Sequence, residues 1–306
     1  MPDCGEGESP CAANVQRRGQ AASGVSAFEP EELAAFCERV WENGARLYRG
    51  LPWRNLDDAY AVLVSEVMLQ QTQVARVRTF WERFMALFPT PDALAAADTS
   101  LLLEQWQGLG YNRRALMLKR AAEACAQYHG GTLPESYDEL LALPGVGPAT
   151  AAGVVAFAYN RPAVYLETNV RTVFLHELFP GEEGVPDRLI RPLVEQTCPA
   201  DNPRGWYYAL LDWGAHIKRT EPNPSRRSAH HTRQSAFEGS RRQKRAELLR
   251  AVLEEPGIGE EALFARLDAF ERAAGRGGAD AAEFSSVLAD LLAEGFFRRE
   301  GSGFVA

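Results

Sequence analysis

The sequence predicts a mainly α-helical protein with a small second domain at its C-terminal end. Apolar residues recur at helical spacing almost everywhere after Pro30, and Pro, Gly or Asn separates the segments. No alternating apolar and polar pattern, as strands show, appears before the last few residues. The apolar fraction of 46% in 306 residues is normal for a protein that forms a core, and it excludes disorder throughout.

The helical pattern divides the first two thirds of the chain into successive segments. One of them is unusually long and contains a break near Gln71, which predicts two helices rather than one. We expect helices at 30–43, 59–88 with that break, 99–107, 113–128, 136–142, 148–159, 169–178, 187–198 and 203–215.

Composition changes mark the domain boundaries. Residues 1–27 lack an apolar segment and carry acidic residues before any basic one, so we expect a disordered leader and no secretory signal. Pro, Ser, Arg and His replace apolar residues in 219–240, which predicts a basic linker. Residues 241–306 then form a second domain, with helices expected at 241–253, 260–267 and 280–294 and a hairpin at 295–306.

Three helices followed by a hairpin resemble a winged helix. Such domains place a helix in the DNA major groove or dock other proteins. No basic recognition face is visible on 280–294, so both uses stay open.

The charge distribution gives a mixed indication about nucleic acid. The net charge of −8 argues mildly against a nucleic-acid binder, because affinity for a polyanion comes from clustered Lys and Arg. Between Lys218 and Arg245, however, nine basic residues are opposed only by Glu221 and Glu238. This stretch is either a phosphate contact or a solvated linker.

Cysteine usage and apolar run length indicate the compartment. The five cysteines are widely scattered and give neither a disulfide framework nor metal-ligand spacing. The longest apolar runs are interrupted and fall short of a bilayer crossing. We therefore expect a cytoplasmic protein without a membrane span.

The segment Leu143-Pro-Gly-Val-Gly-Pro-Ala-Thr-Ala151 carries the clearest binding pattern. Gly145 and Gly147 permit positive backbone angles and a close approach, so that backbone amides and the positive end of the next helix can hold a phosphate oxygen. A helix-hairpin-helix element holds DNA in this way. We assign Gly145, Val146, Gly147 and Thr150 as DNA contacts, against the alternative of an ordinary glycine-rich turn.

Two glutamates lie in surroundings that predict opposite protonation states. Glu66 lies in an apolar helical run, where desolvation is expected to raise its pKa and keep a proton available near neutral pH. Glu167 begins a helix whose positive end is expected to hold it ionised, with Thr168 and Asn169 adding hydrogen bonds. A carboxylic acid and a carboxylate suit a reaction through an oxocarbenium-like transition state. The alternative for Glu167 is a helix-capping carboxylate without a catalytic role.

Five motifs together resemble the adenine DNA glycosylases of the helix-hairpin-helix (HhH-GPD) superfamily of base excision repair, in order and in spacing. The resemblance covers about residues 52–215. The motifs are Leu51-Pro-Trp-Arg54, Val64-Ser-Glu-Val-Met-Leu-Gln-Gln-Thr-Gln-Val74, Gly108-Leu-Gly-Tyr111, Leu143-Pro-Gly-Val-Gly147 and Tyr165-Leu-Glu-Thr-Asn-Val-Arg171.

The resemblance implies a two-lobed helical HhH-GPD domain at 28–218, followed by the winged-helix-like domain at 241–306. It implies a monofunctional glycosylase that removes a flipped adenine from mispaired duplex DNA, opposite 8-oxoguanine or guanine. Glu66 would protonate the adenine ring, and Glu167 with Asn169 would stabilise the sugar cation. The resemblance also gives a base pocket of Arg54, Trp53 and Leu69, and DNA contacts from Gln71, Thr72, Leu109 and Tyr111.

Several positions depart from the family pattern. The family has Asp where this chain has Glu167, and a second Tyr where it has Asn112. Bifunctional relatives have a Lys nucleophile where this chain has Ala149, so we expect no lyase activity. The four cysteines that hold an iron-sulfur cluster after Trp213-Gly-Ala-His-Ile-Lys218 are missing, so we expect no cluster and no other metal. The family's Nudix-like domain, which reads 8-oxoguanine, does not match residues 241–306.

The expected partner is double-stranded DNA with a mispaired or damaged base, bound by a monomer in the cytoplasm and associated with the nucleoid if the source is bacterial. Two alternatives remain open. One is a non-catalytic protein that binds damaged DNA, and the other is a glycosylase for a different lesion.

Overall fold

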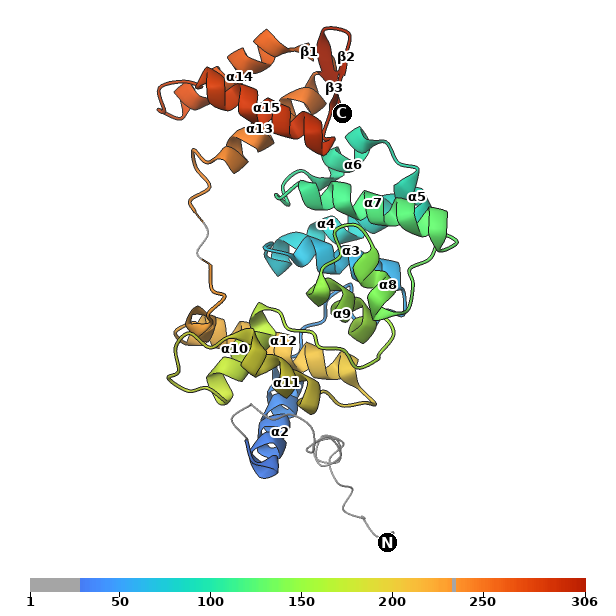
Figure 1. The fold of residues 1–306 in the computed structure, drawn as a ribbon, viewed down its shortest axis with the longest axis vertical. Helices are drawn as coiled ribbons and strands as arrows, with labels where there is room; N and C mark the ends of the chain where they lie inside the picture. Colours follow the sequence, from blue (N-terminus) through green and yellow to red (C-terminus); the bar gives the residue numbers. More distant parts are fainter. Residues whose placement is uncertain (1–27, 233–234) are drawn as a thin grey trace. The chain divides into compact units, whose positions relative to one another are not determined.

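The computed structural model describes residues 28–232 and 235–306 (Figure 1). The predicted leader at 1–27 lies outside these residues. The described residues form two units that alternate along the chain. The first consists of 28–66, Pro134–Ala142 and Val146–Thr232, and the second of Val67–Leu133, Leu143–Gly145 and 235–306. The predicted boundaries at 218 and 240 stay predictions.

The first unit is helical and is organised around one long helix, α12 (Pro203–Thr220), which packs against α2 and α10. Glycines allow both contacts, because a Cβ at Gly44 would collide with Ala209 and one at Gly214 would collide with the backbone of Asn169. The other helices of this unit are α2 (Pro30–Leu47), α8 (Tyr137–Ala142), α9 (Pro148–Phe157), α10 (Thr168–Glu177), α11 (Asp187–Thr197) and the short 3-10 helix η1 (Pro224–Arg227).

Helix α3 (Ala59–Leu69) runs through the division between the units, which falls after Glu66. The second unit continues with α4 (Val74–Leu87), α5 (Pro91–Ala95), α6 (Thr99–Trp106) and α7 (Arg113–Tyr128). Its aromatic core includes Phe84, Phe88 and Trp106, with ring centroids of Phe84 4.9 and 5.8 Å from the other two. Helix α5 packs on α7.

The C-terminal part of the second unit has the winged-helix element order (orange to red in Figure 1). The three strands form an antiparallel sheet in the order β1-β3-β2. The elements are α13 (Arg241–Glu254), β1 (Ile258–Gly259), α14 (Glu260–Ala273), α15 (Ala281–Glu294), β2 (Arg298–Glu300) and β3 (Gly303–Val305).

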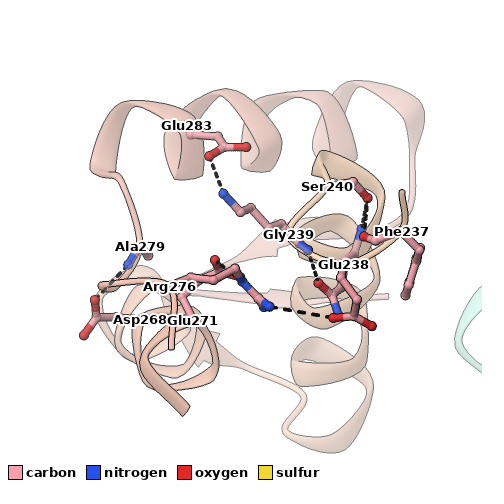
Figure 2. Close-up of polar contacts among 11 residues, drawn as sticks. Phe237, Glu238, Gly239, Ser240, Asp268, Glu271, Arg276, Ala279 and Glu283 are labelled. Carbon is pink, nitrogen blue, oxygen red and sulfur yellow. Dashed lines mark hydrogen bonds and ion pairs between the residues drawn. The ribbon is translucent and has the colours of Figure 1, made fainter. Parts of the chain in front are cut away.

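Many basic side chains of this C-terminal part form ion pairs with acidic side chains of the same part. Arg276 binds the buried Glu271 of α14 through both carboxylate oxygens and lies 3.7 Å from Glu238 (Figure 2). Three further pairs join α13 to α15, namely Arg241 with Asp290, Lys244 with Glu283 and Arg245 with Glu294. Three of the nine clustered basic residues are therefore neutralised by acidic partners within the chain.

The mainly helical fold class is confirmed, including the break near Gln71, because α3 ends at Leu69 and α4 begins at Val74. Sequence reasoning missed α5, η1 and β1, which are too short to show a hydrophobic period. None of the described helices is both long and apolar enough to span a membrane.

Candidate active site

Glu66 is the one acidic residue in the apolar helix α3, where Val64, Val67 and Met68 beside it are buried. Its carboxyl group packs directly against the backbone of α9. A Cβ atom at Gly153 would lie 2.5 Å from Oε2 of Glu66. Glycine at this position therefore leaves the space that the carboxyl group occupies.

The pKa of the Glu66 carboxyl is raised to about 8, chiefly because burial disfavours its charged form. A hydrogen bond from the Tyr165 side chain lowers this pKa, and the negative charge of Glu167 raises it. The prediction that Glu66 holds a proton near neutral pH is thus supported by its surroundings. A group with this pKa suits general acid catalysis.

Glu167 is the N-cap residue of α10. Its Oε1 accepts hydrogen bonds from the backbone amides of Asn169 and Val170, at 2.5 and 3.0 Å, and its Oε2 accepts one from Nδ2 of Asn169 at 3.3 Å. The carboxylate thus lies at the positive end of the helix. Asn169 donates to it as the sequence predicts, whereas the other donor is the amide of Val170 in place of the predicted Thr168.

The expectation that the helix end, with added hydrogen bonds, favours the ionised form of Glu167 needs correction. The pKa of Glu167 is raised, because burial outweighs the opposing effects of the Val170 amide, Lys218 and Asn169. The sequence shows the favourable helix terminus but not the depth at which the carboxyl group lies. The pKa of Glu66 rises to about 8, so this carboxyl group carries a proton at neutral pH, while the oxygens of Glu167 accept three hydrogen bonds that favour its charged form.

Tyr165 is a site residue that sequence reasoning did not assign. Its phenol has a pKa well above the usual value, because it is buried and faces Glu66 and Glu167, so it stays protonated and donates to Glu66. Its ring packs edge-on against Phe157 and Tyr207. A usable signal was present, because side chains two positions apart in an extended segment point to the same side, and Tyr165 precedes Glu167 by two.

The predicted base-pocket residues have different surroundings. Arg54 is buried, and its guanidinium donates to both carboxylate oxygens of Asp212 at 2.7 and 2.8 Å. It also lies over the ring of Tyr208, 4.5 Å from the centroid. Trp53 is buried and Leu69 half-buried. Contact of these three residues with a base stays a prediction, and the pairing with Asp212 was missed because it joins positions 158 residues apart.

The hairpin before α9 has the expected left-handed residue at Gly145, with φ of 75°, where a Cβ would collide with Met117. Gly147 is the N-cap of α9, and its φ of −91° corrects the expectation of a positive angle there. A Cβ at Gly147 would meet nothing within 4 Å, so the backbone is open to close approach. The side chains of Val146 and Thr150 are buried, which leaves their backbone groups as the candidate phosphate contacts.

Two loops of the second unit carry the other predicted DNA contacts. Gln71 and Tyr111 are exposed, as a role in DNA contact requires. Thr72 is half-buried, and its hydroxyl donates to the carbonyl of Leu109 at 3.3 Å. The Leu109 side chain is buried, so its backbone is the part that could contact DNA, and this assignment stays a prediction. The hydroxyl of Tyr111 accepts a hydrogen bond from Arg242 at 2.7 Å.

Comparison with known proteins agrees with this geometry. The profile of the HhH-GPD superfamily base excision DNA repair proteins matches residues 64–190, which include both glutamates and the hairpin. An adenine DNA glycosylase of Mycobacterium tuberculosis is 35% identical over 231 residues, which cover 67% of this chain and 74% of the relative. The chain belongs to the HhH-GPD superfamily of base excision DNA repair proteins.

Other members of the superfamily give a consistent result. An adenine DNA glycosylase of Mycolicibacterium smegmatis is 36% identical over 179 residues, and the match covers 58% of this chain but only 60% of the relative. The structure of a thermostable thymine-DNA glycosylase has a TM-score of 0.58 at 23% identity, covering 63% of this chain and 91% of that one. This likeness shows the HhH-GPD fold.

The loop after α12 in this HhH-GPD chain does not fit an iron-sulfur cluster. Such clusters are held by thiolates, and no cysteine follows Cys198. Instead, Arg227 donates to the carbonyls of Leu175 and Phe179 at the end of α10, at 2.7 and 2.6 Å, and Ser228 forms a β-bridge with Val185. Within 28–232 and 235–306, no group of three or more His, Cys, Asp or Glu residues is placed to hold a metal ion.

Proposed function

We propose that this HhH-GPD protein is an adenine DNA glycosylase that hydrolyses the N-glycosidic bond of an adenine flipped out of mispaired duplex DNA, opposite 8-oxoguanine or guanine. The observation that carries the proposal is the coupled pair of glutamates. Glu66 has a pKa of about 8, and Glu167 lies at the positive end of α10. The names of the relatives support the choice of adenine.

Glu66 supplies the proton in this mechanism. It transfers the proton to a ring nitrogen of the flipped adenine, so that the base leaves as a neutral molecule when the bond to the sugar breaks. Tyr165 orients the carboxyl group through its hydrogen bond. The glycine at 153 lets the carboxyl group lie against α9.

Glu167 stabilises the sugar cation that remains. The two electrons of the glycosidic bond leave with the base, so the sugar carbon becomes electron-poor, and a nearby carboxylate lowers the energy of this state. A water molecule then adds to the sugar carbon, and its proton passes to a carboxylate of the pair. The products are free adenine and an abasic site.

We propose further that the enzyme lacks strand-cutting lyase activity and acts without an iron-sulfur cluster. Ala149 has no amine to form a Schiff base with the sugar, which supports the first statement. The missing cysteines after Cys198 support the second. The proposed partner is duplex DNA, bound by a monomer in the cytoplasm, at the nucleoid in a bacterial cell.

Single-turnover excision tests the function directly. The substrate is a duplex with one adenine opposite 8-oxoguanine, or opposite guanine, and alkali treatment reveals abasic sites. We expect product from the native chain and a loss of about 10²- to 10⁴-fold in Glu66→Gln, which removes the general acid. Omitting alkali should leave the strand intact if lyase activity is lacking.

A native chain that binds these duplexes but yields no abasic site would refute the proposal. Duplexes that carry other damaged bases would then distinguish the two alternatives. Excision of one of these bases indicates a glycosylase for a different lesion, and binding without excision of any base indicates a non-catalytic DNA-binding protein. If Glu66→Gln forms product at the native rate, the proposed role of Glu66 is refuted, but the proposed glycosylase activity is not.

A further inference from the structure

Two loops of the second unit hold non-glycine residues in the left-handed backbone region. The φ angle is 55° at Gln71 and 49° at Tyr111. A bulky residue rarely adopts this conformation, and it persists only where the surrounding structure holds it in place. Both residues are exposed, so the strain lies where DNA contact is expected.

One side chain holds both loops. Nη1 of Arg114 donates to carbonyl oxygens at and just after the end of α3, and Nη2 donates to groups of both loops. The acceptors are the carbonyls of Val67 (2.7 Å), Met68 (3.0 Å), Gln70 (2.6 Å), Leu109 (3.3 Å) and Gly110 (2.9 Å), and Oγ1 of Thr72 (3.1 Å).

The chemistry of this position requires arginine. A planar guanidinium has five donors in a fixed geometry, whereas a lysine ammonium has three donors at one point and cannot reach both sets. The guanidinium also lies over the rings of Trp106 and Tyr111, 5.5 and 5.6 Å from their centroids. Burial lowers its pKa to about 10, so it remains charged at neutral pH beside the negative end of α3.

We propose that Arg114 is a positioning residue for DNA recognition, which fixes the loops 70–72 and 109–111 in one arrangement so that Gln71 and Tyr111 enter a duplex together. The proposal rests on the proposed function for the assignment of these two residues as DNA contacts. Arg114 binds the carbonyl of Val67, the residue after Glu66 on α3. The loops are thereby held to the C-terminal end of α3.

The test uses Glu66→Gln as the parent protein, so that no chemistry is needed. The probe is a duplex with 2-aminopurine next to an adenine opposite 8-oxoguanine, because this fluorophore brightens when it is unstacked. We compare Arg114→Lys with a matched control, Arg113→Lys, which makes the same change at the exposed neighbouring residue. Each titration gives a Kd and a fluorescence gain at saturation. A matched duplex without 8-oxoguanine gives the Kd for binding that depends on phosphate contacts and not on the mispair.

In Arg114→Lys we expect the fluorescence gain at saturation to be smaller by about fivefold or more, since displaced loops no longer unstack the bases. We also expect this variant to bind the mispaired duplex no more tightly than the matched one. Its Kd for the matched duplex should change by less than about threefold, because Arg114 is occupied by the loops and not by phosphate. Arg113→Lys should match the parent in the fluorescence gain.

An Arg114→Lys protein with the parent's fluorescence gain would overturn the proposal, and so would an equal loss of binding to matched and mispaired duplexes. If Arg114→Lys does not fold, Thr72→Val keeps the arginine and removes one acceptor. It should reduce the gain by about twofold or more, and an unchanged gain would overturn the proposal. Because the readout is unstacking, it remains valid if the native chain excises no adenine, so the two proposals fail separately.

Discussion

Replacing Gly153 by alanine should disable Glu66 as the general acid although Glu66 itself is unchanged. The added Cβ would lie 2.5 Å from Oε2 of Glu66 and 3.0 Å from Cε2 of Tyr165. Ordinary contact begins at 3.4 Å, so the carboxyl group must move by about 0.9 Å. A misplacement near 1 Å of a reacting group lowers the rate by on the order of 100-fold, which is the loss we expect.

The protein should stay folded in this variant, because two effects on stability oppose each other. Overpacking a buried site costs about 1–3 kcal/mol, and alanine in place of a helical glycine returns roughly 0.5–1 kcal/mol. The assay is the single-turnover rate of adenine excision, with the thermal midpoint measured alongside. Gly50→Ala is the matched control, since a Cβ there meets nothing within 4 Å and should leave the rate unchanged.

A double-mutant cycle shows whether the loss passes through the carboxyl group. In a Glu66→Gln background, adding Gly153→Ala should lower the residual rate by less than about threefold, because the group that it displaces is already inactive. Near-native excision by Gly153→Ala would refute the reasoning. A further loss of about 100-fold in the Glu66→Gln background would refute it too, since the methyl group would then act elsewhere.

Three further predictions concern the same region. The excision rate should fall about tenfold per unit above pH 8, because Glu66 with a pKa of about 8 is active when protonated, and it should also fall in acid, where the carboxylate of Glu167 takes up a proton; a rate that rises through pH 8 to 9 would contradict this. Glu167→Gln keeps an oxygen to cap α10 but loses the charge, so the thermal midpoint should be unchanged while the excision rate falls at least about 100-fold. Equal excision rates for the native chain and this variant would show that Glu167 only caps the helix. Asp212→Asn leaves the buried Arg54 without its anionic partner, so urea unfolding should show a free energy of unfolding lower by about 3–5 kcal/mol; a decrease below about 1 kcal/mol would show that the pair contributes little to stability.

Sequence periodicity predicts the long helices well because each needs an apolar stripe several turns long. The division of 59–88 into α3 and α4 was predictable for the same reason, since the stripe is interrupted near Gln71. Elements of five residues or fewer, such as α5 and β1, have no room for a period, so only their contacts define them.

The surroundings of a candidate residue were predictable where its residue type is unusual for its place. A glutamate in an apolar helix identifies Glu66, and a carboxylate before a helix identifies Glu167. The contacts of Gly153 and Arg114 were not predictable, because each depends on distant segments meeting in the fold. The same limitation explains Leu109, whose loop reads as exposed although its side chain is buried.

The glutamate at 167 accommodates its additional methylene by folding back onto α10. Its Oε1 takes two backbone amides, so the charge stays at the helix end even though the side chain is longer than an aspartate. The negative charge of Glu167 raises the pKa of Glu66, and burial raises both. Two anions together in this site are therefore unfavourable until a cation lies beside them. In the proposed mechanism, proton transfer from Glu66 creates that second anion at the moment when the sugar becomes positive, so the pair would stabilise the transition state more than the bound substrate.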